Sequence, residues 1–262
     1  MHPMLNIAIR AARAAGNVIM RSFERVESLA VESKQRNDFV SEVDRQAERT
    51  IIDVLLQAYP GHAILAEETG RHGDSEFLWI IDPLDGTTNY LHGLPQFAVS
   101  IALQKGGQLD QAVVYDPVSQ ELFTATRGSG AWLDNKRLRV SQCRSLDASL
   151  LGTGFPYLDS QNAELYLEVF AKFMQSSSGI RRPGAAALDL AYVAAGRYDG
   201  FWESGLQTWD VAAGALIVRE AGGLIGDFQA GETWLETGQI VAANPKIFHA
   251  MLQILKPYAN QF

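Results

Sequence analysis

The order of strand and helix signals along the chain constrains its fold more than any other feature. From residue 62 to residue 128, short apolar strands follow one another, separated by Gly106-Gly107 and by a turn at residues 116–119. Such separators are typical of hairpins, so this stretch predicts an antiparallel meander. After about residue 140, predicted strands at 148–156, 199–203 and 238–245 alternate with predicted helices at 160–175, 185–196, 210–221 and 246–256. That alternation indicates a parallel or mixed sheet.

Two amphipathic helices come before the meander. Residues 4–23 and 42–58 each place apolar side chains on one helical face, and Pro60-Gly61 ends the second helix. With 262 residues, the chain is long enough for a sizeable core. We therefore expect two subdomains in one rigid unit. The first is an α+β subdomain over residues 1–140 with the antiparallel sheet, and the second an α/β subdomain over residues 141–262 that completes the site.

Composition excludes several classes of protein. No run of eighteen apolar residues is present, which argues against a membrane span, and the first residues lack the apolar core of a signal peptide. Cys143 is the only cysteine, so an intrachain disulfide is impossible and a reducing, cytoplasmic location is the simplest interpretation. The net charge of −8 and the lack of a basic stripe argue against a nucleic-acid module, yet they allow a local acidic pocket for cations.

Carboxylates gather where predicted strands end. Asp82 and Asp85 follow the apolar run at residues 77–81, Glu67-Glu68 end the previous strand, and Asp210 begins a helix. If these ends converge, the carboxylates need a cation to stay ionised together. Oxygen ligands select Mg²⁺, Mn²⁺ or Ca²⁺, whereas the five histidines and one cysteine show no zinc spacing.

A phosphate-binding turn is expected directly after the two aspartates. Gly86-Thr87-Thr88 suits the first turn of a short helix, where free backbone N–H groups bind anions. We expect Pro83 to stop the strand and to hold both aspartates at a fixed angle. Candidate metal-binding carboxylates therefore lie next to a turn that can bind phosphate. This arrangement favours metal-assisted hydrolysis of a phosphate ester.

Each of these residues also has a purely structural interpretation. Asp82 suits an Asx turn and Asp85-Gly86 an ordinary turn. Asp44 and Asp210 suit helix capping. Glu67-Glu68 would be a solvated strand end, and Arg181-Arg182 surface charge. Because all of these residues occur together in one chain, a shared functional site explains them better than a separate structural role for each.

Two motifs resemble the signatures of the inositol monophosphatase family. They are "DPLDGTTN" at residues 82–89 and "WDVAAGALIVREAGG" at residues 209–223, and "EE" at 67–68 precedes the first at the expected distance. The resemblance runs over nearly the whole chain and is strongest to bacterial members. It implies a layered αβαβα sandwich like that of the sugar bisphosphatases, a homodimer, Mg²⁺ dependence with two or three ions per site, and inhibition by lithium.

The resemblance also assigns roles by motif position. The residues that resemble the metal ligands are Glu67, Asp82, Leu84 through its carbonyl, Asp85 and Asp210. The catalytic residues that it implies are Asp44 and Thr87, which orient the attacking water, and Glu67. The residues that it implies for substrate binding are Leu84, Asp85, Gly86, Thr87, Arg181, Gly184, Ala185, Ala186, Glu203 and Asp210.

Three functions remain open at this stage. The first is hydrolysis of inositol monophosphate. The second is the same chemistry on a sugar bisphosphate, histidinol phosphate or phosphoadenosine phosphate, which residues 155–186 and 200–208 would decide. The third is a regulatory role, because bacterial members of the family are associated with ribosomal RNA transcription through RNA polymerase and antitermination factors.

Overall fold

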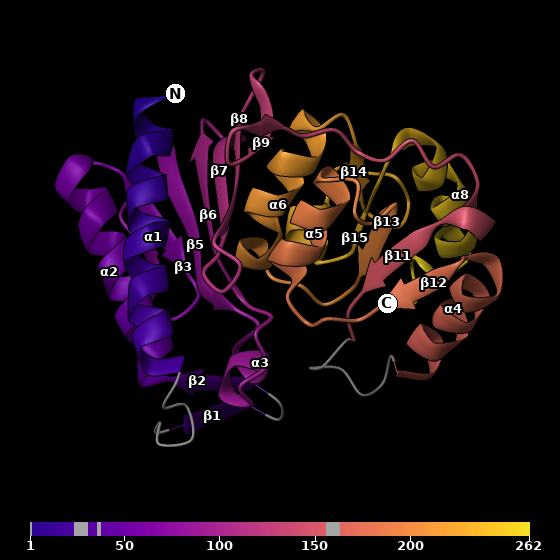
Figure 1. Cartoon of the computed structure of the whole chain (residues 1–262), viewed down its shortest axis with the longest axis horizontal. Coiled ribbons are helices and arrows are strands. Elements are labelled where there is room, and N and C mark those ends of the chain that lie inside the picture. Colours follow the sequence, from indigo (N-terminus) through magenta and orange to yellow (C-terminus); the bar gives the residue numbers. More distant parts are fainter. Residues whose placement is uncertain (1, 24–30, 36–37, 156–162) are drawn as a thin grey trace.

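Five alternating layers of helices and sheets make up the chain (Figure 1). The computed structural model describes residues 2–23, 31–35, 38–155 and 163–262, with residues 31–41 described by backbone only. Two helices cover the outer face of a large sheet, two lie between the large sheet and a small one, and two cover the outer face of the small sheet. In chain order these six helices are α1 (Pro3–Phe23), α2 (Glu42–Ala58), α4 (Ala163–Ser176), α5 (Ala186–Ala194), α6 (Thr208–Glu220) and α8 (Pro245–Leu255). The layered αβαβα sandwich expected from the resemblance is confirmed.

The large sheet has eight strands in the order β10-β9-β8-β7-β6-β5-β3-β4. Its strands are β3 (Ala63–Ala66), β4 (Gly70–His72), β5 (Phe77–Asp85), β6 (Ala98–Lys105), β7 (Gln108–Asp116), β8 (Glu121–Thr126), β9 (Gly130–Leu133) and β10 (Lys136–Arg137). From β5 to β10 each strand pairs antiparallel with the next, which confirms the meander there. β3 instead pairs parallel with β5, because β4 takes the other edge of β3 and the chain returns past it.

The small sheet is mixed, as the strand–helix alternation predicted. Its strands are β11 (Leu150–Thr153), β12 (Gly179–Arg181), β13 (Gly200–Glu203), β14 (Leu224–Gly226) and β15 (Ile240–Ala243). β11 pairs parallel with β12 and β13, whereas β15 pairs antiparallel with β13 and β14. The proposed division into subdomains at residue 140 stays a prediction.

The two central helices differ from the outer ones in being buried on nearly every side. Residues 211–218 of α6 are all buried, and so are residues 186–191 of α5. A helix without a polar face is stable only when apolar surfaces surround it, and here a sheet lies on each side. The helices approach closely at Gly214, where a Cβ atom would lie 2.5 Å from that of Leu190.

The outer helices follow the predicted apolar stripes. α1 buries Leu5, Ala8, Ala12, Ala15 and Ile19 against the large sheet, so the predicted helices at 4–23 and 42–58 are confirmed. The predicted helix at 160–175 corresponds to α4, although residues 160–162 lie outside the described part of the chain. No helix in the described ranges is both long and apolar enough to cross a membrane.

Several short elements lie outside these regular layers. They are β1 (Val31–Gln35), β2 (Asp38–Ser41), α3 (Thr87–Leu91), η2 (Leu146–Ala148), α7 (Trp234–Thr237) and η4 (Lys256–Tyr258). Of these, only the helical turn at α3 was predicted from the sequence.

Candidate active site

A cavity of about 210 Å³ brings most of the predicted site residues together. It lies between the end of β5, helix α3, the end of β13 and the first turns of α5 and α6. Its lining residues are Glu67, Asp82, Leu84, Asp85, Gly86, Thr87, Thr88, Asn89, Gly154, Arg182, Gly184, Ala185, Ala186, Glu203, Leu206 and Asp210. Five of them are carboxylates, and one is an arginine.

Strand β5 delivers two of the carboxylates through an irregularity in the sheet. The pairing of β5 with β6 shifts register between Asp82 and Asp85, at Pro83 and Leu84. The expectation that Pro83 stops the strand is therefore wrong, because β5 continues to Asp85 through a bulge that accommodates the missing N–H. Asp82 is only 2% exposed, and its Oδ1 accepts a hydrogen bond of 3.0 Å from the Leu84 N–H. Asp82 therefore forms the Asx turn and also lines the pocket, so the structural interpretation does not exclude the functional one.

Asp85 joins the large sheet to helix α5. Its Oδ2 accepts a hydrogen bond of 2.7 Å from the backbone N–H of Ala187 in the first turn of that helix. Burial, and then the neighbouring charge of Asp210, raise the pKa of Asp85 to about 8, although N–H groups of α5 act in the opposite direction. Burial, followed by the charges of Glu67 and Asp85, raises the pKa of Asp82 well above its usual range.

Asp210 serves as a helix cap and also lines the pocket. It is the third residue of α6, and its Oδ2 accepts a hydrogen bond of 2.7 Å from the N–H of Gln207. Its other oxygen remains for a ligand, and burial raises the pKa of Asp210 to about 6. The interpretation of Asp210 as the N-cap itself is wrong, because Gln207 is the N-cap of α6 and Asp210 caps it from the third helical position. This contact does not compete with a role in the site.

The carboxylates fit a hard cation by their chemistry. In the described part of the chain, no three His, Cys, Asp or Glu side chains are already close enough to ligate one ion. The carboxylates nevertheless line one cavity and raise one another's pKa values, as acids do that share a site without a counter-charge. A divalent cation with oxygen ligands offsets such repulsion, so the donor set suits Mg²⁺ and similar ions.

The predicted phosphate turn requires glycine at residue 86. Gly86 has φ +93°, and a Cβ atom there would lie 2.8 Å from the carbonyl oxygen of Gln96. Both the left-handed conformation and the close backbone approach exclude a larger side chain. Gly86 is the N-cap of α3, so the backbone of Thr87 follows directly at the pocket wall.

Thr87 and Asp44 meet across 43 residues of sequence. The Thr87 hydroxyl lies 3.1 Å from Asp44 Oδ1 and 3.0 Å from the carbonyl oxygen of Leu84, and it donates to either acceptor. Asp44 is 1% exposed in the first turn of α2. Its alternative capping partner, the side chain of Ser41, lies outside the described side chains.

Glu203 forms the opposite wall of the pocket at the end of β13. It is 7% exposed, so its carboxylate is not a solvated strand end. Burial raises the pKa of Glu203 well above its usual range, followed by the charges of Asp210 and Asp85, while Arg182 acts in the opposite direction. A Cβ atom on Gly154 would overlap the Glu203 carboxylate, so only glycine leaves room for it.

The structure corrects the predicted arginine. Arg181 is exposed at the end of β12, where it donates to the carbonyl of Ile180, and it does not line the cavity. The next residue, Arg182, is half-buried in the cavity wall. The turn that follows, Gly184 to Ala186, lines the cavity as expected.

Three supporting residues escaped the sequence analysis. Asn89 lies inside the quoted motif, and its Nδ2 donates hydrogen bonds of 2.8 Å to the carbonyls of Gln96 and Pro183, which fixes the Gly184 turn. Glu48 is fully buried one helical turn after Asp44, and it accepts a hydrogen bond of 2.7 Å from the N–H of Glu68. The third is Gly154. Only the helical spacing of Glu48 from Asp44 offered a signal in advance.

Comparison with known proteins decides the family. The model of the inositol monophosphatase family matches residues 1–257. The chain belongs to the inositol monophosphatase family. It is 56% identical to the Nus factor SuhB of Pseudomonas aeruginosa, over 98% of this chain and 97% of the relative.

Solved structures agree with this assignment. The fold matches the crystal structure of the extragenic suppressor protein SuhB from Bartonella henselae with a TM-score of 0.95 and 46% identity, over 97% of this chain and 99% of the other. It matches the inositol monophosphatase from Anabaena with a TM-score of 0.86 and 38% identity, over 97% of this chain and 95% of the other.

Proposed function

We propose that the chain is a Mg²⁺-dependent phosphomonoesterase that hydrolyses inositol monophosphate to inositol and phosphate. The observation that carries this proposal is the shared cavity, which five carboxylates including Glu203 line together with Thr87. Asp44 does not line the cavity but contacts the Thr87 hydroxyl from behind its wall. Membership of the inositol monophosphatase family supports it. Sensitivity to lithium is a further expectation of the same proposal.

The residues proposed to hold two or three Mg²⁺ ions are Glu67, Asp82, Leu84 through its carbonyl, Asp85 and Asp210. Bound there, Mg²⁺ supplies Lewis-acid chemistry, which neutralises phosphoryl charge and lowers the pKa of water. Because Asp85 and Asp210 each use one oxygen on a backbone N–H, their other oxygens are the ones that remain for the ions.

The protein's own groups position the reactants. Thr87 and Asp44 are proposed to orient the attacking water, whose proton passes to this pair as its oxygen bonds to phosphorus. The bond from phosphorus to the alcohol oxygen breaks in the same displacement, and that oxygen takes up a proton from solvent. No covalent link to the protein forms. The backbone after Gly86 contacts the phosphate. Glu203, Arg182 and the turn from Gly184 to Ala186 face the leaving alcohol and select it by hydrogen bonds.

A panel of phosphate monoesters, assayed with and without Mg²⁺, tests the proposal. We expect hydrolysis of inositol monophosphate in Mg²⁺ and none after chelation. A higher kcat/KM for a sugar bisphosphate, histidinol phosphate or phosphoadenosine phosphate would change the proposed substrate. The proposed reaction, metal-dependent hydrolysis of a phosphate monoester, would stand. Absence of turnover on every ester would overturn the proposal.

A second candidate function is regulatory. The observation that favours it is the 56% identity to a relative named Nus factor SuhB. We propose RNA polymerase or antitermination factors as partners, in the cytoplasm, with contacts through protein surfaces. A pull-down with a catalytically inactive variant separates this function from the first, because retained capture of polymerase subunits would show that catalysis is dispensable for it.

A homodimer is also proposed. Helix α4 carries Leu167 and Met174, which are 60% and 59% exposed and lie seven residues apart on one helical face. Phe155, 43% exposed, is a further large apolar side chain on the surface of the same half of the chain. Apolar surface of this kind favours burial against a second copy.

Glu203 is expected to determine substrate preference. Glu203→Gln should raise KM for inositol monophosphate more than it lowers kcat, because a buried hydrogen-bond acceptor for substrate hydroxyls becomes a poorer partner, at a cost of about 1–3 kcal/mol. An aryl phosphate with few hydroxyls should be affected much less. Steady-state kinetics on both substrates provide the measurement. Equal losses on both would point to a metal or structural role instead.

Gly154→Ala offers a matched test of the same wall. The added methyl group must displace the Glu203 carboxylate, so the substrate-selective pattern of Glu203→Gln should reappear. Gly61→Ala is the control, because a Cβ atom there meets nothing within 4 Å. Unchanged kinetics for Gly154→Ala would show that Glu203 need not occupy its present position.

A further inference from the structure

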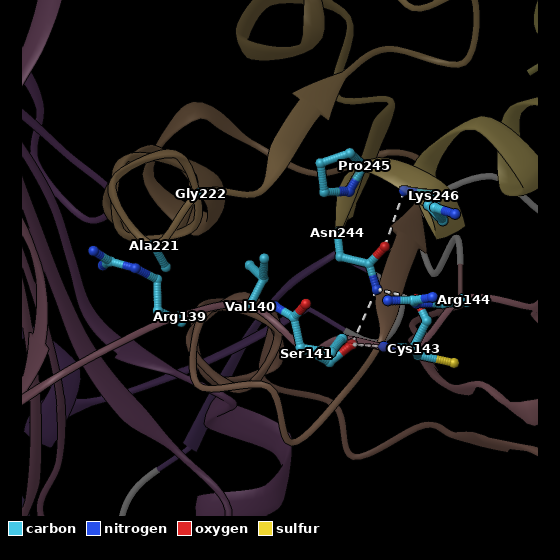
Figure 2. Close-up of a pocket in the computed structure, with 11 residues that line it drawn as sticks. Arg139, Val140, Ser141, Cys143, Arg144, Ala221, Gly222, Asn244, Pro245 and Lys246 are labelled. Carbon is cyan, nitrogen blue, oxygen red and sulfur yellow. Dashed lines mark hydrogen bonds between the residues drawn. The ribbon is translucent and has the colours of Figure 1, made fainter.

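A second cavity, of about 530 Å³, lies at the junction between the two sheets (Figure 2). Its walls are the linker at residues 139–144, the end of α6 at Ala221 and Gly222, and the start of α8 at residues 244–246. None of these residues lines the candidate active site. The cavity is therefore a separate feature that the proposed phosphatase chemistry does not use.

A buried asparagine fixes the shape of this cavity. Asn244 is 3% exposed and uses both ends of its amide. Its Oδ1 accepts hydrogen bonds of 3.0 and 3.1 Å from the N–H groups of Lys246 and Ile247, and its Nδ2 donates to Ser141 Oγ at 3.0 Å and to the Cys143 carbonyl at 3.1 Å. The linker is thereby held against the first turn of α8 (Figure 2). A wall built in this way is formed before any ligand arrives.

The charge of the cavity is opposite to that of the protein. The chain carries a net charge of −8, yet the lining contains Arg139, Arg144 and Lys246 and no acidic residue. Within the part of the chain that the structure describes, no carboxylate forms an ion pair with Arg144 or Lys246. Arg144 and Lys246 lie together at the α8 end of the cavity, whereas the Arg139 side chain, beside Ala221, points away from them (Figure 2). Arg144 and Lys246, two neighbouring cations without acidic partners, indicate an anionic ligand.

Neutral groups in the cavity complement these charges. Ser141 Oγ accepts hydrogen bonds from the Cys143 N–H and from Asn244, so its own hydrogen remains available to a ligand. Val140, which is 8% exposed, provides apolar surface in the cavity. The lining thus combines one anion-binding end, at Arg144 and Lys246, with apolar surface that suits the carbon skeleton of an organic molecule.

We propose that this cavity binds a small organic phosphate that carries more than one negative charge. Its volume falls within the range of about 300–1,000 Å³ that small-molecule sites occupy. The planar guanidinium of arginine matches phosphate oxygens with two parallel hydrogen bonds. A long polyanion would need cations along an extended surface, whereas Arg144 and Lys246 are exposed side chains at the rim of one hollow.

Calorimetric titration with ADP and with inorganic pyrophosphate, in the presence of a chelator, tests the site. Chelation removes the cations through which the acidic active site would hold phosphate, so binding must come from elsewhere. The pocket variant is Arg144→Ser/Lys246→Ser. Its control is Arg10→Ser/Lys256→Ser, which removes the same charge from exposed positions outside the cavity. We expect one ADP per chain, bound at least tenfold more weakly by the pocket variant and unchanged by the control.

Other results would overturn the inference. These are absence of binding to the wild-type chain, equal weakening in both double variants, and tighter binding of a glutamate-rich peptide than of ADP or pyrophosphate. The last result would identify an acidic protein segment as the ligand instead. Hydrolysis of inositol monophosphate in Mg²⁺ is measured in parallel and should be unchanged in the pocket variant. That assay separates failure of this site from failure of the proposed phosphatase function.

Discussion

Asp85→Asn is expected to lower phosphatase turnover by at least about 10²-fold, the loss typical of removing one group that stabilises transition-state charge. The physical reason is that Asp85 presents one oxygen to the pocket while the other accepts the Ala187 N–H. Asparagine keeps the second contact through its carbonyl oxygen, but it offers a neutral amide to the cation. The measurement is kcat for inositol monophosphate at saturating Mg²⁺, together with the Mg²⁺ concentration for half-maximal activity.

Stability provides the control for this variant, with a defined dependence on pH. The folded-state pKa of Asp85 is raised to about 8, so the wild-type chain binds a proton there more tightly when folded. The stability that this proton contributes is lost as pH rises through about 8. In chelator, the Tm of the wild-type chain should therefore fall relative to that of Asp85→Asn between pH 5 and pH 9.

Two outcomes would contradict this assignment of Asp85. Wild-type turnover in well-folded Asp85→Asn protein would show that the carboxylate does not hold a catalytic cation. A Tm difference independent of pH would show that Asp85 is not a buried acid with a raised pKa. Asp85→Ala also removes the contact to α5, so it should lose stability that Asp85→Asn retains.

The fold could be predicted where local signals determine it. Hairpin turns between β6, β7 and β8 identify antiparallel neighbours, because two residues reverse the chain after β6 and four after β7, which leaves little choice of partner. The parallel pairing of β3 with β5 has no such local signal, since it depends on which edge of β3 the hairpin to β4 occupies. β10 and β14 contain two and three residues, too few to show any periodicity.

The site divides in the same way. Asp82, Asp85 and Thr87 lie within one motif, so their proximity follows from the sequence. Arg182 was missed in favour of Arg181, because the direction in which the chain leaves β12 decides which of two adjacent side chains reaches the cavity. Asn89 contacts Pro183, which lies 94 residues later in the sequence. No local sequence pattern predicts a contact over that separation.

Thr87→Val is expected to lower kcat by roughly 10²-fold, in line with the contribution of a positioned proton-transfer group. Valine keeps the branched shape of the side chain but deletes the hydroxyl, which donates to Asp44 Oδ1 or the Leu84 carbonyl. The water that this pair is proposed to orient would lose one of its two partners, whereas the phosphate would still meet the backbone after Gly86. KM should therefore change little. A raised KM at constant kcat would make Thr87 a binding residue.

A double-mutant cycle decides whether Thr87 and Asp44 act as one unit. Asp44→Asn should cost about as much as Thr87→Val, because the asparagine amide cannot take a proton from the hydroxyl. If the pair works together, Thr87→Val/Asp44→Asn should be hardly slower than either single variant. Thr87→Ser, which restores the hydroxyl, should recover most of the turnover. If the fold-decrease in kcat of the double variant equals the product of the two single decreases, the two residues act independently. The 3.1 Å contact between them would then be structural.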